Sequence, residues 1–135
     1  MNQMKQIAAS LGLPETWEQK NGSWWICQEG LDVRLMAEVM RAREARFVTL
    51  TAMQVEAGGR VRLDYHWDLG GRLLTFTTHA NGKQMASIVD LCPAADWVER
   101  ETHETFSIEF TGHLYEPLLL RAGATTGMQL RKEGQ

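Results

Sequence analysis

The sequence predicts an α+β fold, with an antiparallel sheet of about four strands flanked by helices and followed by an extended C-terminal arm. Three observations support this fold class. Apolar residues recur at helical spacing near both ends, period-two alternation marks the middle of the chain, and Gly-Gly or Asn-Gly pairs separate the alternating runs. We expect a single α+β domain over residues 1–113 and a C-terminal docking arm over residues 114–135.

The first part of the chain predicts a helix, a strand and a second helix. Residues 2–11 form a short helix that Pro14 ends, because proline cannot continue a helix. Residues 23–28 are rich in β-forming side chains and include two adjacent tryptophans, which must point to opposite faces of a strand. Asp32 can cap the second helix, whose inward face is formed by Leu35, Met36, Val39 and Met40.

The middle of the chain predicts three antiparallel strands. Residues 47–56 carry apolar side chains on both faces, which is typical of a central strand. In residues 61–68 the apolar and polar side chains alternate strictly, as in a half-exposed strand. Residues 73–78 return as the third strand. The paired glycines between these strands are interpreted as hairpin residues, since no glycine-rich phosphate loop stands between a strand and a helix. His66 and His79 are expected to be solvated.

Composition excludes several classes of protein. The chain has 44% apolar residues, 23% charged residues and a formal net charge of -3, so it is neither disordered nor basic enough for nucleic acid. No apolar run approaches the roughly 18 residues that span a bilayer, and the start lacks the apolar core of a signal peptide. Cys27 and Cys92 are too few to hold an iron–sulfur cluster. We expect reduced, partly buried thiols in a cytosolic chain, with a disulfide as the alternative.

The most distinctive pattern lies in residues 93–113, where acids, an arginine and aromatics stand at helical spacing before a short strand. This segment resembles the signature of the 30-kDa subunit family of respiratory complex I, the NADH-quinone oxidoreductase. The family has relatives in membrane-bound, energy-converting NiFe hydrogenases. The matching positions are Pro93, Trp97, Glu99, Arg100, Glu101, Phe106, Ile108, Phe110, Gly112 and His113.

The chain departs from the family pattern at several positions. Glu104 stands where the family has aspartate, and Ser107 stands where it has glycine, which puts the turn after the helix in doubt because serine rarely adopts a positive φ. The tail retains leucines and a basic pair but lacks the family's prolines and tryptophan. The short length and these departures favour the energy-converting hydrogenase version over the respiratory one.

The resemblance implies a non-catalytic peripheral-arm subunit that serves as a scaffold in a complex I-like redox complex. Its partners would be other subunits, chiefly the large 49-kDa-type subunit related to the hydrogenase large subunit. Iron–sulfur, flavin or nickel–iron centres are expected in those partners, and none in this chain. The resemblance places the chain on the cytoplasmic side of the cell membrane as a peripheral subunit, without a span of its own.

A helix over residues 94–106 would place Trp97, Arg100, Glu101 and Glu104 on one broad face. An exposed Arg100–Glu104 pair contributes only ~0.3 kcal/mol, so stability alone does not explain so many charges there. We interpret the face and the leucine-rich arm as a partner interface. Its candidate residues are Trp97, Glu99, Arg100, Glu101, Glu104, Phe106, His113, Leu118, Leu119, Leu120, Arg131 and Lys132.

Two other classes of function stay open. A free-standing interaction adaptor would have the same fold without a redox partner. A small acid–base or metal enzyme would use Glu101, Glu104 and His103, with His113 as a further ligand, although no His-Glu-x-x-His motif is present. Convergence of these side chains on one site would favour the enzyme.

Overall fold

The computed structural model describes residues 2–55 and 60–113. The predicted docking arm at 114–135 lies outside the described residues. So do its candidate interface residues, which are Leu118, Leu119, Leu120, Arg131 and Lys132.

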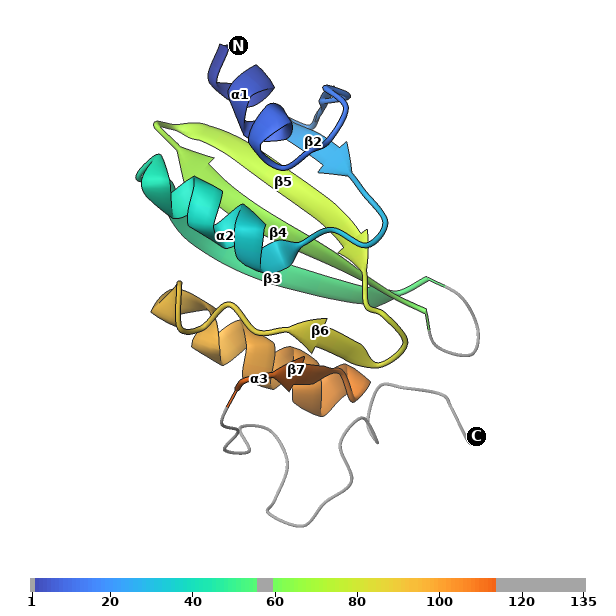
Figure 1. Ribbon diagram of the computed structural model, residues 1–135. Coiled ribbons are helices and arrows are strands. Elements are labelled where there is room, and N and C mark those ends of the chain that lie inside the picture. The colour runs from blue at the N-terminus through green and yellow to red at the C-terminus, as the bar shows by residue number, and fades with distance from the viewer. Residues whose placement is uncertain (1, 56–59, 114–135) are drawn as a thin grey trace.

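The described chain has the predicted α+β architecture, with one mostly antiparallel sheet of five strands and three α-helices (Figure 1). In chain order the elements are α1 (Asn2–Ser10), β1 (Glu18–Lys20), β2 (Ser23–Cys27), α2 (Val33–Ala42), β3 (Arg46–Gln54), β4 (Val61–Leu69), β5 (Arg72–His79), β6 (Gln84–Ala86), a 3-10 turn (Pro93–Ala95), α3 (Asp96–Phe106) and β7 (Glu109–Thr111). The strand order is β1-β2-β5-β4-β3, in which only β2 and β5 are parallel, and β6 pairs with β7 in a second small sheet.

The two N-terminal helices cover one face of the large sheet. In α1, Met4 and Ile7 are fully buried, and the helix ends at Ser10, before Gly12 adopts a positive φ of 69°. The predicted cap of α2 is confirmed, because the Asp32 carboxylate accepts a hydrogen bond of 3.1 Å from the amide of Leu35. Figure 1 shows α2 lying across β3 and β4. The apolar side chains of these helices therefore form the core with this face of the sheet.

The three-strand meander is confirmed, but the prediction of a central position for the strand at 47–56 is wrong. β3 is the last strand of the sheet among the described residues and pairs only with β4. A bulge between Phe47 and Thr49 shifts the alternation, so that Phe47 and Leu50 both reach the core. Apolar residues thus stand at both odd and even positions of the strand, although only one of its faces is buried.

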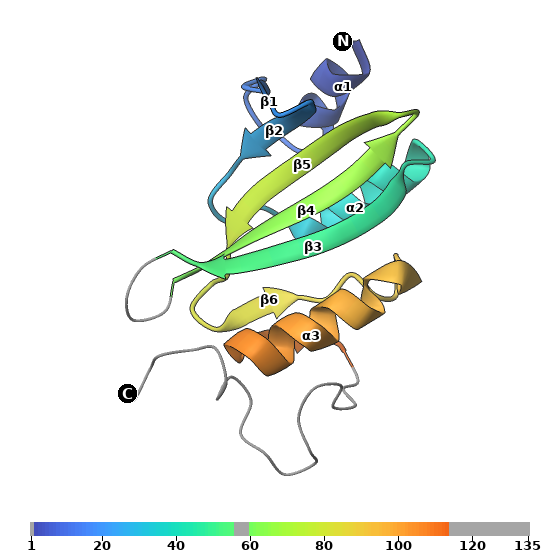
Figure 2. The same ribbon diagram turned by 180° about the vertical axis from the view of Figure 1, so that it is seen from behind.

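Polar side chains alternate with buried apolar ones along β4 and lie on the opposite face of the sheet from the core. Figure 2 shows this rear face without a helix crossing it. The expectation that His66 is solvated is wrong. His66 is half-buried, with Nδ1 2.8 Å from the Thr75 hydroxyl and Nε2 3.1 Å from that of Thr51. Trp25 packs edge-on against His66, with ring centroids 5.9 Å apart. These contacts explain why a polar alternation on β4 does not produce a fully hydrated face.

The expectation that His79 is solvated is also wrong, since its side chain is only 16% exposed. Its Nδ1 lies 2.6 Å from the Glu29 carboxylate, which also pairs with Arg60. This cluster joins the end of β5 to the loop before α2. The partner of His79 is distant in sequence, which is why local patterning did not indicate it.

Candidate protein interface

α3 lies beside the outer edge of β3, together with β6 and β7 (Figures 1 and 2). Its first turn follows the 3-10 turn at Pro93–Ala95, where proline at the start of a helical segment costs no hydrogen bond. The helix carries Asp96 and Glu99 in its first turn, as the helix dipole favours. Its inward face consists of Glu99, Thr102 and Glu104. Two of these are carboxylates, so the packing of α3 depends on internal polar partners.

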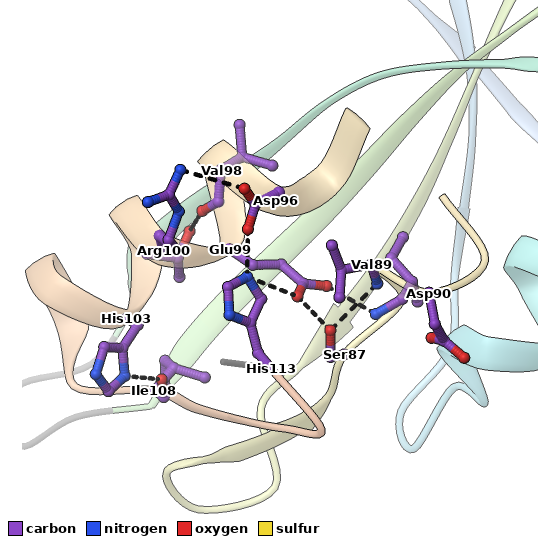
Figure 3. Close-up of polar contacts among 12 residues, drawn as sticks. Ser87, Val89, Asp90, Asp96, Val98, Glu99, Arg100, His103, Ile108 and His113 are labelled. Carbon is purple, nitrogen blue, oxygen red and sulfur yellow. Dashed lines mark hydrogen bonds and ion pairs between the residues drawn. The ribbon is translucent and has the colours of Figure 1, made fainter. Parts of the chain in front are cut away.

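Glu99 is fully buried and joins α3 to the loop after β6 (Figure 3). One carboxylate oxygen accepts a hydrogen bond of 2.6 Å from the Ser87 hydroxyl, and the other accepts one of 2.8 Å from the amide of Ile88. The Ser87 hydroxyl in turn accepts from the amide of Val89 at 3.2 Å. Because a buried carboxylate without partners is very costly, these bonds make Glu99 a structural clamp between two segments.

His113 closes the same cluster at the last described residue (Figure 3). Its side chain is 1% exposed, and Nε2 lies 2.9 Å from an Asp96 oxygen and 3.9 Å from a Glu99 oxygen. The second Asp96 oxygen lies 3.2 Å from the Arg100 guanidinium. Asp96 thus connects His113 to the surface of α3.

Burial is the largest influence on Glu99 and raises the pKa of its carboxyl above the ordinary value of 4.5. The hydrogen bonds from Ile88 and Ser87 and the nearby His113 act in the opposite direction but are weaker. Burial also raises the pKa of Tyr65 well above its usual range, and the charge of Glu99 adds to that shift. The charge of Glu99 therefore acts on Tyr65 in the core of the sheet as well as on its own hydrogen-bonding partners.

The turn after α3 keeps a left-handed backbone although serine replaces glycine. Ser107 has φ 58° and ψ 31°, and its amide donates to the carbonyl of His103 at 2.9 Å. His103 Nδ1 lies 2.9 Å from the carbonyl of Ile108, which can only accept, so this nitrogen donates. The turn therefore keeps its backbone conformation despite the serine. The left-handed conformation strains the backbone at Ser107, because L-residues disfavour it.

The exposed side of α3 is narrower than predicted. Trp97 is 55% exposed and Glu101 is exposed, whereas Glu104 is 4% exposed, so the four predicted residues do not form one solvent-facing surface. Arg100 and Phe106 are half-buried. Glu99, Glu104 and His113 lie inside the chain and not on its surface. Sequence reasoning treated carboxylates on a helix as surface groups, and the signal it lacked was the distant pairing with Ser87.

A groove of about 480 Å³ lies between α3 and β3. Its walls are Thr49, Leu50, Thr51 and Ala52 from the strand and Glu101, Thr102, Thr105 and Phe106 from the helix. Sequence reasoning did not find this groove, because it depends on the placement of α3 beside an edge strand. Glu101 is the acidic group among the lining residues.

The residues proposed for an enzyme do not converge. Glu101 is exposed, Glu104 is buried, and His103 is bound to the carbonyl of Ile108. Across residues 2–55 and 60–113, no three His, Cys, Asp or Glu side chains are grouped so as to hold a metal ion. Cys27 is exposed on β2 and Cys92 is buried before α3, and both are free thiols. Burial raises the pKa of the Cys92 thiol.

The fold and this site define an α+β protein in which buried Glu99 holds α3 in place, while Trp97 and Glu101 on the same helix are exposed. Residues 29–135 match the family model described as respiratory-chain NADH dehydrogenase, 30 Kd subunit, and the chain belongs to this family.

Among curated relatives, the C-type subunit of NADH-quinone oxidoreductase from Rhodopseudomonas palustris (strain BisB18) is 31% identical over 107 residues, which cover 75% of this chain and 53% of that protein. The J-type subunit of NAD(P)H-quinone oxidoreductase from Synechococcus sp. (strain WH7803) is 39% identical over 62 residues, covering 46% of this chain and 34% of that protein. The chain therefore spans about half the length of the first of these relatives and about a third of the second.

Two solved structures share the fold. One is a chain of the membrane-bound sulfane sulfur reductase, an archaeal respiratory membrane complex, with a TM-score of 0.72, 21% identity, and coverage of 88% of this chain and 75% of that chain. The other is the trypsin-resistant fragment of Nqo5, with a TM-score of 0.66, 18% identity, and coverage of 84% of this chain and 96% of that one. In the described part of this chain, no helix is long and apolar enough to cross a membrane.

Proposed function

We propose that this chain is a non-catalytic peripheral subunit of a complex I-like redox complex and that α3 docks it onto a neighbouring subunit. Membership of the 30-kDa subunit family supports the class of complex. The observation that carries the docking proposal is Trp97, a large aromatic residue that is 55% exposed on a helix fixed from inside by Glu99. Aromatic side chains are enriched at the energetic centres of protein interfaces.

The proposed partner is the large 49-kDa-type subunit, on the cytoplasmic side of the cell membrane. Iron–sulfur, flavin or nickel–iron centres would lie in the partner subunits. The cysteine count supports this assignment, because the sequence has two cysteines whereas an iron–sulfur cluster generally takes four thiolates.

The docking proposal is tested by co-isolation of partner subunits with the tagged full chain from membranes in mild detergent. Trp97→Ala is expected to reduce the recovery of partner subunits at least ~10-fold, because losing an aromatic anchor commonly costs more than about 1.4 kcal/mol of binding. The isolated variant should stay folded and lose about 1 kcal/mol of its free energy of unfolding, since 55% of the side chain is exposed.

A charge pair supplies the control. Glu101→Lys reverses an exposed charge on α3, whereas Glu38→Lys makes the same change on the exposed side of α2. We expect reduced recovery only for the α3 variant. Equal recovery of wild type, Trp97→Ala and Glu101→Lys would show that α3 is not the docking surface.

A further inference from the structure

We propose that Arg41, Arg43, Arg46 and Arg72 form a cationic surface, at the end of the molecule where α2 ends and β5 begins, that binds an acidic segment of a partner subunit. This inference rests on the proposed function, because the acidic segment belongs to a neighbouring subunit of the same complex. It adds the chemistry of the partner and a second contact surface, neither of which α3 docking requires.

The sequence concentrates positive charge in two short segments. Residues 41–46 and 68–72 contain the four arginines of the cationic surface, whereas the acids of these segments are Glu44 and Asp68. The whole chain has a formal net charge of -3, so this local excess of positive charge belongs to an otherwise acidic molecule. A local excess of one sign attracts a surface of the opposite sign and orients its approach.

The fold brings the two segments together. Arg41 lies in the last turn of α2, and Arg43 caps the end of this helix. Arg46 begins β3 and stands opposite Asp68 near the end of β4. Arg72 begins β5, directly after the turn that follows β4. Figure 1 shows the end of α2, the start of β3 and the β4–β5 turn together at the left of the molecule, so the four arginines share one end.

Three of these arginines have no acidic partner within the described chain. The other described arginines each lie near a carboxylate, in the pairs Arg34–Asp90, Arg46–Asp68, Arg60–Glu29, Arg62–Asp64 and Arg100–Asp96. Among residues 2–55 and 60–113, no carboxylate lies within salt-bridge distance of Arg41, Arg43 or Arg72. The Arg43 guanidinium instead donates a hydrogen bond of 3.2 Å to the Gln6 side-chain oxygen on α1. The arginines that lack an acidic partner are thus concentrated at this end.

The residue type indicates the chemistry of the partner. All four cations are arginines, and a planar guanidinium can bind both oxygens of one carboxylate. Arg41 and Arg46 are exposed, whereas Arg43 and Arg72 are half-buried and so lose less side-chain entropy when they bind. Attraction to a membrane of anionic lipids generally takes roughly 4–8 basic residues, and here two acids reduce the excess. The surface therefore suits a protein segment with a carboxylate for each arginine that lacks one.

The cationic surface adjoins the proposed docking helix. Burial raises the pKa of the Cys92 thiol, and the charge of Arg41 acts in the opposite direction, which indicates that Arg41 lies near this residue. Cys92 directly precedes the 3-10 turn that leads into α3. Both views show this turn at the same end of the molecule as the C-terminus of α2 (Figures 1 and 2). One partner can therefore contact the arginines and Trp97 in the first turn of α3.

The first test compares two double variants of the tagged full chain, isolated from membranes in mild detergent. Arg41→Gln with Arg72→Gln removes two cations and retains side chains that form hydrogen bonds. Lys20→Gln with Lys83→Gln is the control, because it removes the same charge from exposed lysines elsewhere. We expect the arginine variant to recover the partner subunits at least ~5-fold less well, equivalent to about 1 kcal/mol, and the lysine variant to match wild type. Circular dichroism and the thermal midpoint establish that both variants are folded.

The second test uses hexaglutamate as the probe and follows the backbone amides of the isolated full chain by NMR. At low ionic strength the peptide is expected to shift the amides of Arg41, Arg43 and Arg72 more than those of Lys20 and Lys83. Raising the salt to about 1 M shortens the Debye length to about 3 Å and should abolish these shifts. Shifts of equal size at the two lysines would overturn a specific site for acidic segments.

The outcomes separate this inference from the proposed function. Normal recovery with the folded arginine variant, together with loss of recovery for Trp97→Ala, would overturn the cationic surface and leave α3 docking in place. Cosedimentation of the chain with phosphatidylserine–phosphatidylcholine vesicles, lost in the arginine variant, would assign the surface to anionic lipid and overturn an acidic protein segment. Failure of the wild-type chain to recover redox subunits would overturn both proposals.

Discussion

At the scale of single residues, the signature acids have a structural role inside the chain. Glu99 bonds to the loop after β6 through Ser87 and the amide of Ile88, and His113 contacts Asp96 from the end of the described chain. A residue of this kind can be required for assembly without touching a partner, because it sets the position of α3. Substitutions at Glu99 should therefore be judged first by their effect on folding.

Glu99→Ala is expected to destabilise the isolated chain by ~2–4 kcal/mol, because it leaves the Ser87 hydroxyl and the Ile88 amide without their acceptor in the core. Urea unfolding of the two proteins at neutral pH measures the difference. Trp97→Ala is the comparison, since 55% of its side chain is exposed whereas Glu99 is fully buried. A cost below ~0.5 kcal/mol for Glu99→Ala would contradict the clamp.

The raised pKa of Glu99 gives a pH dependence with a defined sign. The folded state holds the proton of this carboxyl more tightly than the unfolded chain, whose ordinary pKa is 4.5. The stabilising contribution of the protonated group is therefore complete below pH 4.5 and is lost as the pH rises through the folded-state pKa. Relative to Glu99→Gln, wild type should gain stability as the pH is lowered from neutral toward 4.5. Denaturant titrations of both proteins across this range measure the difference in their free energies of unfolding. A loss of wild-type stability relative to Glu99→Gln as the pH falls would contradict the raised pKa of Glu99.

At the scale of elements, the predictable parts were those with a clear period. The Asp32 cap, the amphipathic α2 and the β3–β5 meander follow directly from the sequence. β1 and β6 were not predicted, because 3 residues are too few to show a period, whereas β7 is the short strand expected after the signature helix. The edge position of β3 was missed because the bulge places buried apolar residues at both odd and even positions. Such a pattern is normally typical of a central strand with two buried faces. The burial of Glu99 was missed because its partners are 11 and 12 positions away.

The turn after α3 gives a prediction at this scale. Ser107 has a left-handed backbone, which costs an L-residue roughly 1–2 kcal/mol. Glycine avoids this cost, but part of the gain is offset because glycine loses more conformational entropy on folding. Ser107→Gly is therefore expected to raise the free energy of unfolding by about 0.5–1 kcal/mol. Ser107→Val is the opposing variant and should lower it, because β-branched residues disfavour positive φ. Thermal unfolding of wild type and the two variants measures these changes. A glycine variant less stable than wild type would contradict backbone strain at Ser107.

At the scale of the whole molecule, the described chain divides its surface between two roles. α1 and α2 close one face of the sheet and complete the core. The other end presents α3, with the exposed Trp97, and the groove between α3 and β3. A helix that is held from inside by Glu99 and exposes Trp97 suits a scaffold that joins neighbouring subunits. The family membership gives this scaffold its proposed setting in a redox complex.

The most direct measurement of the central claim is isolation of the tagged full chain from its native membranes in mild detergent, with identification of the co-purifying subunits and analysis of metals and flavin. We expect a large hydrogenase-like subunit together with iron. Nickel would identify the hydrogenase version, whereas flavin without nickel would identify the NADH-quinone version. Recovery of the chain alone, without metal or redox subunits, would contradict the scaffold role.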